Sequence, residues 1–199
     1  MKKIVIIGAE GAIGKKIKET FLTEEFEIIS VGKSSGQYQV NIDDVESVKA
    51  LYAQIGKFDA LVCAAGNLAL APLQQLERQH WDIGLNSKLM GQINLVQQGI
   101  AHINEGGSFT LVSGIGPISQ GGAVAMVVNK GIEAYAISAA CEMPKGIRIN
   151  VVSPNMITES ETIFRPFFPG GKSVPGSDVA LAFKRSVMGV QTGQVFKVH

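Results

Sequence analysis

The chain has 199 residues, of which 46% are hydrophobic and 18% charged, and its formal net charge is +1. This composition excludes a disordered chain, which needs low hydrophobicity or high net charge, and the length suits one domain. The nearly neutral charge predicts no nucleic-acid or membrane partner, and no apolar run reaches the about 18 residues of a transmembrane helix. The two cysteines and three histidines lie too far apart in sequence for a disulfide framework or a metal site. We therefore expect a cytoplasmic protein without a metal.

Along the chain, short aliphatic runs alternate with longer stretches whose apolar residues recur at helical spacing, such as Ile13, Ile17 and Phe21. Several runs are apolar at consecutive positions, which is typical of a parallel sheet covered on both faces. The alternation predicts a single doubly wound, Rossmann-type α/β domain over residues 1–199, with helices on both faces of about seven strands. The expected strands are 3–7, 27–31, 37–40, 60–63, 108–112, 148–152 and 194–198.

A glycine-rich loop follows the first expected strand and precedes a helical pattern. It contains Gly8, Gly11 and Gly14. Glycine permits the tight turn and lets a diphosphate approach the backbone amides at a helix N-terminus. The spacing alone is a weak motif, but its place between strand and helix favours nucleotide binding over a simple tight turn. We include Glu10 and Ile13 among the expected cofactor contacts of this loop.

Later residues resemble, in order, the landmarks of the short-chain dehydrogenase/reductase family. Residues 63–66, Cys-Ala-Ala-Gly, are similar to the family's N-N-A-G, and residues 147–154 and 192–194 resemble its sixth strand and its final T-G-Q. Ser113 stands where the family places its active-site serine, and Lys130 matches the family's lysine. The resemblance covers nearly the whole chain and implies the small single-domain form of the family. The sequence is similar to a subgroup of this family whose active site is incomplete.

The resemblance implies a nicotinamide dinucleotide cofactor. Residues 30–36 contain no Asp or Glu for a ribose 2′-hydroxyl, whereas Lys33 and Ser34 suit a 2′-phosphate. NADP is therefore expected rather than NAD, with an ordinary polar turn as the alternative. By their matching positions, the other implied cofactor contacts are Asn41, Ile42, Ala64, Ala65, Gly66, Lys130, Pro154, Ile157 and Thr158.

Two positions depart from the family's catalytic pattern. Met126 replaces the tyrosine four residues before Lys130, and a thioether has no proton to donate. Lys88 stands at the position of the family's asparagine, with Asn86 displaced by two residues. Lys88 would be a proton donor if burial lowered its pKa, but most lysines are exposed, which favours a solvated side chain. Tyr135 lies half a helical turn out of phase with Met126 and offers no replacement.

Three further segments carry expectations. Residues 155–176 hold Phe164, Phe167 and Phe168 among prolines and glycines, which favours a lid over a substrate site, with an ordered surface loop as the alternative. A last helix is expected to begin at Ser177, which would cap it. Residues 121–143 contain few charges, so we expect this helix to be buried on more than one side, in a homodimer or homotetramer, with burial wholly within the monomer as the alternative.

These observations leave two functions open. The first is an NADP-dependent oxidoreductase that transfers hydride to or from an unknown small molecule and uses Ser113, Lys130 and Lys88, with Met126 as the degenerate tyrosine position. Ser113 has an alternative role, because a hydroxyl at a strand end also caps local backbone. The second function is a non-catalytic protein that binds or senses NADP(H), because a fold can keep its cofactor site after losing its chemistry.

Overall fold

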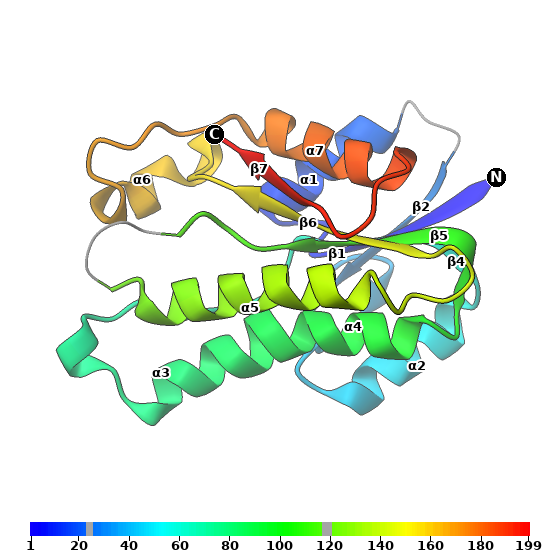
Figure 1. Ribbon diagram of the computed structural model, residues 1–199, viewed down its shortest axis with the longest axis horizontal. Helices are drawn as coiled ribbons and strands as arrows, with labels where there is room; N and C mark the ends of the chain where they lie inside the picture. Colours follow the sequence, from blue (N-terminus) through cyan, green and yellow to red (C-terminus); the bar gives the residue numbers. More distant parts are fainter. Residues whose placement is uncertain (23–25, 117–120) are drawn as a thin grey trace.

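The computed structural model describes residues 1–22, 26–116 and 121–199. It contains one seven-stranded sheet in the order β3-β2-β1-β4-β5-β6-β7, in which every neighbouring pair is parallel (Figure 1). This confirms the Rossmann-type α/β fold. The strands are β1 (Lys2–Ile7), β2 (Phe26–Gly32), β3 (Tyr38–Gln39), β4 (Phe58–Cys63), β5 (Ile103–Val112), β6 (Arg148–Pro154) and β7 (Val195–Val198).

Helices cover both faces of the sheet. Helices α2, α4 and α5 pack on one face, and α1 and α7 pack on the other (Figure 1). The α-helices are α1 (Ala12–Phe21), α2 (Val45–Ile55), α3 (Arg78–Ile83), α4 (Gln92–Gly99), α5 (Ala123–Ala139), α6 (Glu161–Phe164) and α7 (Gly176–Met188). A π-helical segment, η2 (Gly84–Gly91), joins α3 to α4, and η1 (Leu73–Gln75), η3 (Thr158–Ser160) and η4 (Arg165–Phe167) are single 3₁₀ turns. Within the described ranges, no helix has the length and apolarity to cross a membrane.

The central strand β1 explains why its residues are apolar at consecutive positions. Ile4 and Ile6 belong to the core under α1 and α7, whereas Val5 and Ile7 belong to the core under α2, α4 and α5. All four side chains are buried. Side chains alternate between the faces of a strand, and each buried aliphatic contributes about 1.5–3 kcal/mol. A strand that separates two cores is therefore apolar throughout.

The order of the strands reverses between β1 and β4. The chain first adds β2 and β3 on one side of β1 and then returns to add β4 on the other side. In open α/β sheets, ligands bind outside the carboxyl ends of the strands at such a reversal. Gly8, which follows β1, and Ala64, which follows β4, lie so close that a Cβ on Gly8 would be 2.8 Å from the Ala64 carbonyl oxygen. The two strand ends thus approach each other backbone to backbone.

The start of α7 differs from the sequence-based expectation. The helix begins at Gly176 and its N-cap is Pro175, so Ser177 is not the cap. The Gly176 N–H instead donates to the Glu159 carboxylate, with 3.0 Å to Oε2. A carboxylate from a distant turn has replaced the local serine as the acceptor for the end of the helix.

Candidate functional site

Two cavities lie at the carboxyl edge of the sheet. The larger has a volume of about 310 Å³, and its lining includes Ile13, Ala64, Lys88, Ser113, Asn129, Pro154, Ile157, Phe164, Phe167 and Phe168. The smaller, of about 100 Å³, is lined in part by Gly8, Lys33, Asn41, Ile42, Ala65 and Gly66. Most of the residues predicted from the sequence are thus brought together in two neighbouring places. We call these the substrate cavity and the adenosine cavity, after the ligands that the sequence-based expectation assigns to their residues.

The glycine loop offers an open helix N-terminus. Gly8 has a φ of +80°, which favours glycine, and a Cβ on Gly14 would lie 2.1 Å from the Gly8 carbonyl oxygen. Gly11 caps α1 without a side-chain hydrogen bond, and the first turn of α1 has no acidic residue. The loop fits the expected diphosphate, because amides of the first turn are free of an internal acceptor. Glu10 is exposed and forms an ion pair with Lys18, 2.7 Å away.

The adenosine cavity contains residues that the sequence did not single out. Asp43, Asn67 and Ser87 line it together with Lys33. Ser34 is exposed and does not belong to the described lining. The wall at Ile42 is fixed from α4, because the Asn94 Nδ2 donates to the Ile42 carbonyl oxygen at 3.1 Å. This wall could not be predicted, because it depends on a contact between residues 52 positions apart.

The π-helical segment brings Lys88 to the end of β5. Gln92 is fully buried, and its Nε2 donates to the carbonyl oxygens of Lys88 (3.0 Å) and Val112 (2.9 Å). Its Oε1 accepts from the Val112 N–H at 2.9 Å. One amide therefore joins the widened helical turn to β5, which ends at Val112, one residue before Ser113. Such π turns often occur at functional sites, because they redirect the side chains that follow.

Lys88 is buried, so the expectation of a solvated lysine is wrong. The side chain lines the substrate cavity and the residue is 8% exposed. Burial lowers the pKa of Lys88 from its usual 10.5 to about 8, although the nearby Cys63 opposes the shift. A lysine with this pKa can give up its proton near neutral pH. Asn86, by contrast, is exposed on the same segment.

Ser113 contacts a carboxylate that sequence analysis missed. Its Oγ donates to Oε1 of Glu133 at 3.0 Å, and the Ser153 hydroxyl donates to the same oxygen at 3.1 Å. Lys130 donates to the other oxygen, Oε2, at 2.7 Å. The alternative of Ser113 capping local backbone is therefore wrong. The available signal was Glu133 itself, an acidic residue three positions after Lys130 in an otherwise apolar helix.

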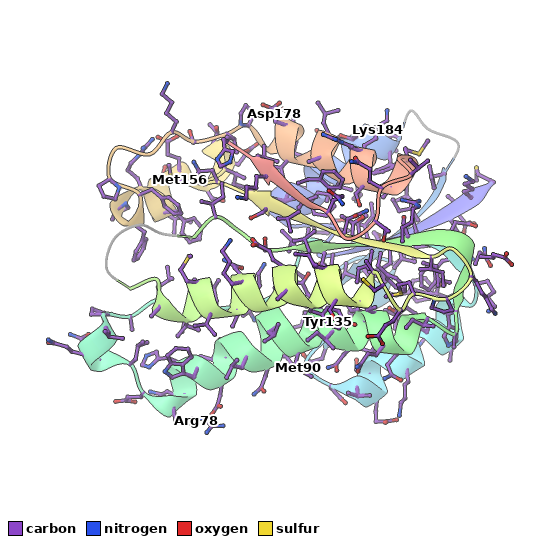
Figure 2. The ribbon with its side chains drawn as sticks, in the orientation of Figure 1. Arg78, Met90, Tyr135, Met156, Asp178 and Lys184 are labelled. Atoms are coloured by element: carbon purple, nitrogen blue, oxygen red, sulfur yellow. The ribbon has the colours of Figure 1, made fainter. Side chains whose placement is uncertain are left out.

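Three other residues of α5, Met126, Asn129 and Tyr135, differ in their relation to the substrate cavity. Met126 is partly buried, and its sulfur lies 2.2 Å from where a Cβ on Gly116 would be. Asn129 lines the substrate cavity, and within the described structure its buried Oδ1 has no hydrogen-bond partner. The side chain of Tyr135 extends from α5 on the side of α4, well away from the cavity residue Met156 (Figure 2). The prediction that Tyr135 cannot replace the missing tyrosine agrees with this position.

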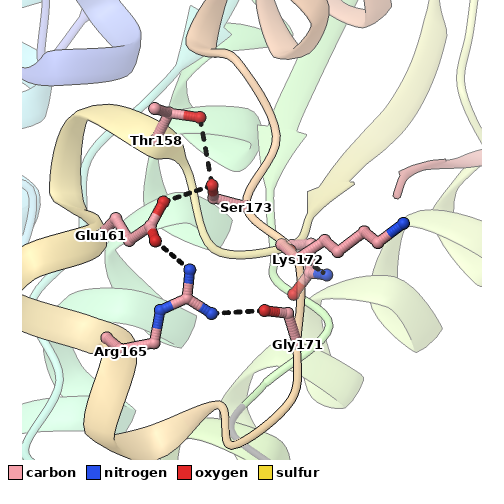
Figure 3. Close-up of polar contacts among 7 residues, drawn as sticks. Thr158, Glu161, Arg165, Gly171, Lys172 and Ser173 are labelled. Carbon is pink, nitrogen blue, oxygen red and sulfur yellow. Dashed lines mark hydrogen bonds and ion pairs between the residues drawn. The ribbon is translucent and has the colours of Figure 1, made fainter.

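Residues 155–176 contribute part of the lining of the substrate cavity. Its two ends meet in a bridge between Ile157 and Val174. Glu161 accepts hydrogen bonds from Arg165 and Ser173, and Arg165 also donates to the Gly171 carbonyl oxygen (Figure 3). Thr158 donates to Ser173 at 3.3 Å and does not belong to the described cavity lining. The three phenylalanines of this segment do line the cavity, which brings apolar surface over Lys88 and Ser113.

By sequence, the chain matches a family model and a reductase of known name. A family model described as enoyl-(acyl carrier protein) reductase matches residues 13–167. A 3-oxoacyl-(acyl carrier protein) reductase of Staphylococcus aureus is 30% identical over 158 residues, which span 75% of this chain and 63% of that protein. The chain thus aligns with less than two thirds of that relative's length.

Solved structures extend the likeness to the whole chain. The protein lin1944 from Listeria innocua has 44% identity and a TM-score of 0.97, and the match covers 100% of both chains. A small-chain dehydrogenase solved in complex with NADPH has a TM-score of 0.87 and 24% identity, over 99% of this chain and 96% of its own. The likeness to this NADPH complex, at 24% identity, shows the fold alone.

Proposed function

This chain belongs to the short-chain dehydrogenase/reductase family, and on that premise we propose that it is an NADP(H)-dependent oxidoreductase acting on a small carbonyl compound or alcohol. The observation that carries the proposal is Lys88, a buried lysine with a lowered pKa in the same cavity as Ser113. In this proposal Lys88 takes over the proton transfer that Met126 cannot perform.

The cofactor assignment is supported by the two cavities. The glycine loop would hold the diphosphate, and the adenosine cavity would hold the nucleoside beside Asn41 and Ile42. Lys33 lines that cavity and supplies a cation for a 2′-phosphate, which favours NADP over NAD. Lys130, with 52% of its side chain exposed, would bind ribose hydroxyls while its pairing with Glu133 fixes its position.

The chemical step needs one hydride and one proton. When bound, the nicotinamide supplies the hydride for the carbonyl carbon. The Lys88 ammonium gives its proton to the carbonyl oxygen, which leaves neutral Lys88 and an alcohol; alcohol oxidation is the reverse. The apolar surface of Phe164, Phe167 and Phe168 excludes water from this step and keeps the lysine desolvated.

We place the protein in the cytoplasm as a homodimer or homotetramer. Cys63 and Cys141 are both free, which fits a reducing compartment. Val127 and Ile137 on α5 are 50% and 52% exposed, so the outer face of this helix presents apolar surface. A second copy would cover that surface.

The test is NADPH oxidation with an activated diketone, 1-phenyl-1,2-propanedione, by three proteins. Wild type should turn over, Lys88→Met should lose activity by about 100-fold or more, and Met126→Tyr should gain at least about tenfold, since general acid catalysis contributes about 10²–10⁴-fold. NADPH affinity, measured separately by nicotinamide fluorescence, should stay nearly constant in all three. Wild-type activity that survives Lys88→Met would defeat the lysine assignment.

The second candidate is a non-catalytic NADP(H)-binding or sensing protein. Met126 favours it, because the side chain at the family's tyrosine position has no acidic proton. Tight NADPH binding without turnover in all three proteins, including Met126→Tyr, would select this candidate.

A further inference from the structure

Glu133 accepts hydrogen bonds from several side chains behind Ser113, which lines the substrate cavity. The residue is 8% exposed, and its carboxylate accepts from Ser113, Ser153 and Lys130 at 3.0, 3.1 and 2.7 Å. An ionised carboxylate is only an acceptor, and a buried one is stabilised by donors of this kind. Both serines and the lysine are therefore required to donate toward Glu133.

This arrangement fixes the polarity of Ser113. A serine hydroxyl has one proton and two lone pairs. Because the proton of Ser113 points to Glu133, the lone pairs remain for a ligand in the substrate cavity, which Ser113 lines. A carbonyl oxygen has no proton and cannot bind to such a serine. A ligand hydroxyl can.

Lys88 has the opposite polarity. Its ammonium is a donor without a lone pair, and it lines the same cavity. A ligand that bonds to both residues must present an acceptor to Lys88 and a donor to Ser113. The remaining wall is largely apolar, with Leu68, Leu70 and the three phenylalanines.

We propose that Glu133 is a positioning residue that makes Ser113 a hydrogen-bond acceptor, so that the substrate cavity selects hydroxy ketones, in which a hydroxyl lies near the carbonyl. This inference rests on the proposed function, because it names the substrate class of that same site. A simple ketone leaves the lone pairs of Ser113 without a partner, and an unmade buried hydrogen bond lowers affinity.

The experiment measures binding of matched ketone pairs without turnover. Protein saturated with NADP⁺ is titrated calorimetrically with 2-hydroxyacetophenone against acetophenone, and with 3-hydroxypropiophenone against propiophenone. Each pair differs by one hydroxyl, and the two pairs sample two spacings from the carbonyl. Wild type should prefer the hydroxy ketone of at least one pair by about three- to tenfold, which is the range that one neutral hydrogen bond supports.

Three variants separate a positioning role from a structural one. Glu133→Gln keeps an oxygen that accepts from Ser113, so the preference should remain. Glu133→Leu frees the Ser113 proton and should reduce the preference to about one. Ser153→Ala is the matched control, because Ser153 donates to the same carboxylate oxygen but does not belong to the described cavity lining, and it should leave the preference unchanged.

If Glu133→Leu does not fold, Ser113→Ala tests the acceptor itself, since it removes the hydroxyl and should also abolish the preference, and the retained preference of Glu133→Gln tests the positioning role. Equal affinities within both pairs for wild type would overturn the proposal, as would a preference that survives Ser113→Ala or Glu133→Leu. Failure to bind any of the four ketones would overturn it too. NADP⁺ affinity, obtained in the same titration series, distinguishes this failure from failure of the proposed function, which would abolish cofactor binding or NADPH oxidation.

Discussion

Gly66 lies directly against Lys88: a Cβ on Gly66 would be 2.8 Å from Cδ of Lys88 and 3.0 Å from its Cα. Gly66 also has a φ of +127°, where side chains are rarely tolerated. The loop after β4, which lines the adenosine cavity, thus touches the π-helical segment that carries the proposed proton donor. A change at this contact is therefore expected to affect both the adenosine cavity and the substrate cavity.

Gly66→Ala should therefore damage both halves. We expect a loss of about 2 kcal/mol or more in the free energy of unfolding, because backbone strain and a close contact add, together with weaker NADPH binding. Gly146→Ala is the control, since Gly146 has a φ of +66° but open space around it, and it should cost only the strain. Urea unfolding and NADPH titration provide the comparison. Equal losses in the two variants would contradict a packing role for Gly66.

Lys33 should set the cofactor preference. One charge-assisted contact to a 2′-phosphate contributes about 1.5–3 kcal/mol, so NADPH should bind about tenfold or more tighter than NADH. Lys33→Glu should remove or invert that ratio, whereas Lys57→Glu makes the same charge change at a lysine bonded to the Ala101 carbonyl oxygen, outside both cavities. Isothermal titration with both cofactors measures the ratio, and an unchanged ratio in Lys33→Glu would remove the support for NADP.

Burial of Lys88 should cost stability in a pH-dependent way. Its folded pKa of about 8 lies below its usual 10.5, so below pH 8 the folded protein contains a desolvated charge that the unfolded chain keeps in water. Between pH 8 and 10.5 only the unfolded chain remains protonated, and the cost disappears as pH rises.

Lys88→Met should consequently raise the free energy of unfolding at pH 7 by about 3 kcal/mol, with a gain that shrinks toward zero by pH 10.5. Lys197→Met, at an exposed position on β7, should show no such trend. Denaturant unfolding from pH 6 to 10.5 gives the curve. A gain that stays constant across this range would show that Lys88 titrates alike in the folded and unfolded chain, so that burial does not lower its pKa.

The exposed apolar face of α5 should mediate self-association. Light scattering at micromolar concentration should give at least twice the chain mass of 21.1 kDa. Ile137→Asp should shift the mass toward the monomer, because a charge would be desolvated in the contact. Leu22→Asp, at a 72% exposed leucine next to α1, should not. A wild-type mass near 21.1 kDa would refute the oligomer.

Local sequence patterns predicted the strands and covering helices well, because these elements depend on residues that are close together in the chain. Consecutive apolar residues located the strands, and the helical spacing of Ile17 and Phe21 located α1, since burial on a given face requires that spacing. Errors occurred at the ends of elements. The start of α7 differs because the distant Glu159 accepts from the Gly176 N–H, and strand β3 is limited to Tyr38–Gln39 instead of 37–40.

Spacing along the chain pointed to Gly8 and Ser113, both of which line the described cavities, but it did not give the surroundings of Lys88 and Glu133. Single-residue statistics favour a solvated lysine, whereas Lys88 is buried because a π-helical turn and the Gln92 amide direct it inward. Glu133 was missed because its partners come from β6 and the end of β5 as well as from its own helix. Neither arrangement follows from spacing along the chain.

The most direct test of the proposed chemistry is the pH dependence of kcat/KM for NADPH-dependent reduction of 1-phenyl-1,2-propanedione. If Lys88 donates the proton, kcat/KM should be constant below a pKa of about 8 and should fall about tenfold per pH unit above it, because only the ammonium form of the free enzyme is active. Lys88→Met should retain NADPH binding and lose this dependence together with most of the rate. A wild-type kcat/KM that is independent of pH up to 10, or an undiminished kcat/KM in Lys88→Met, would contradict the assignment of Lys88 as the proton donor.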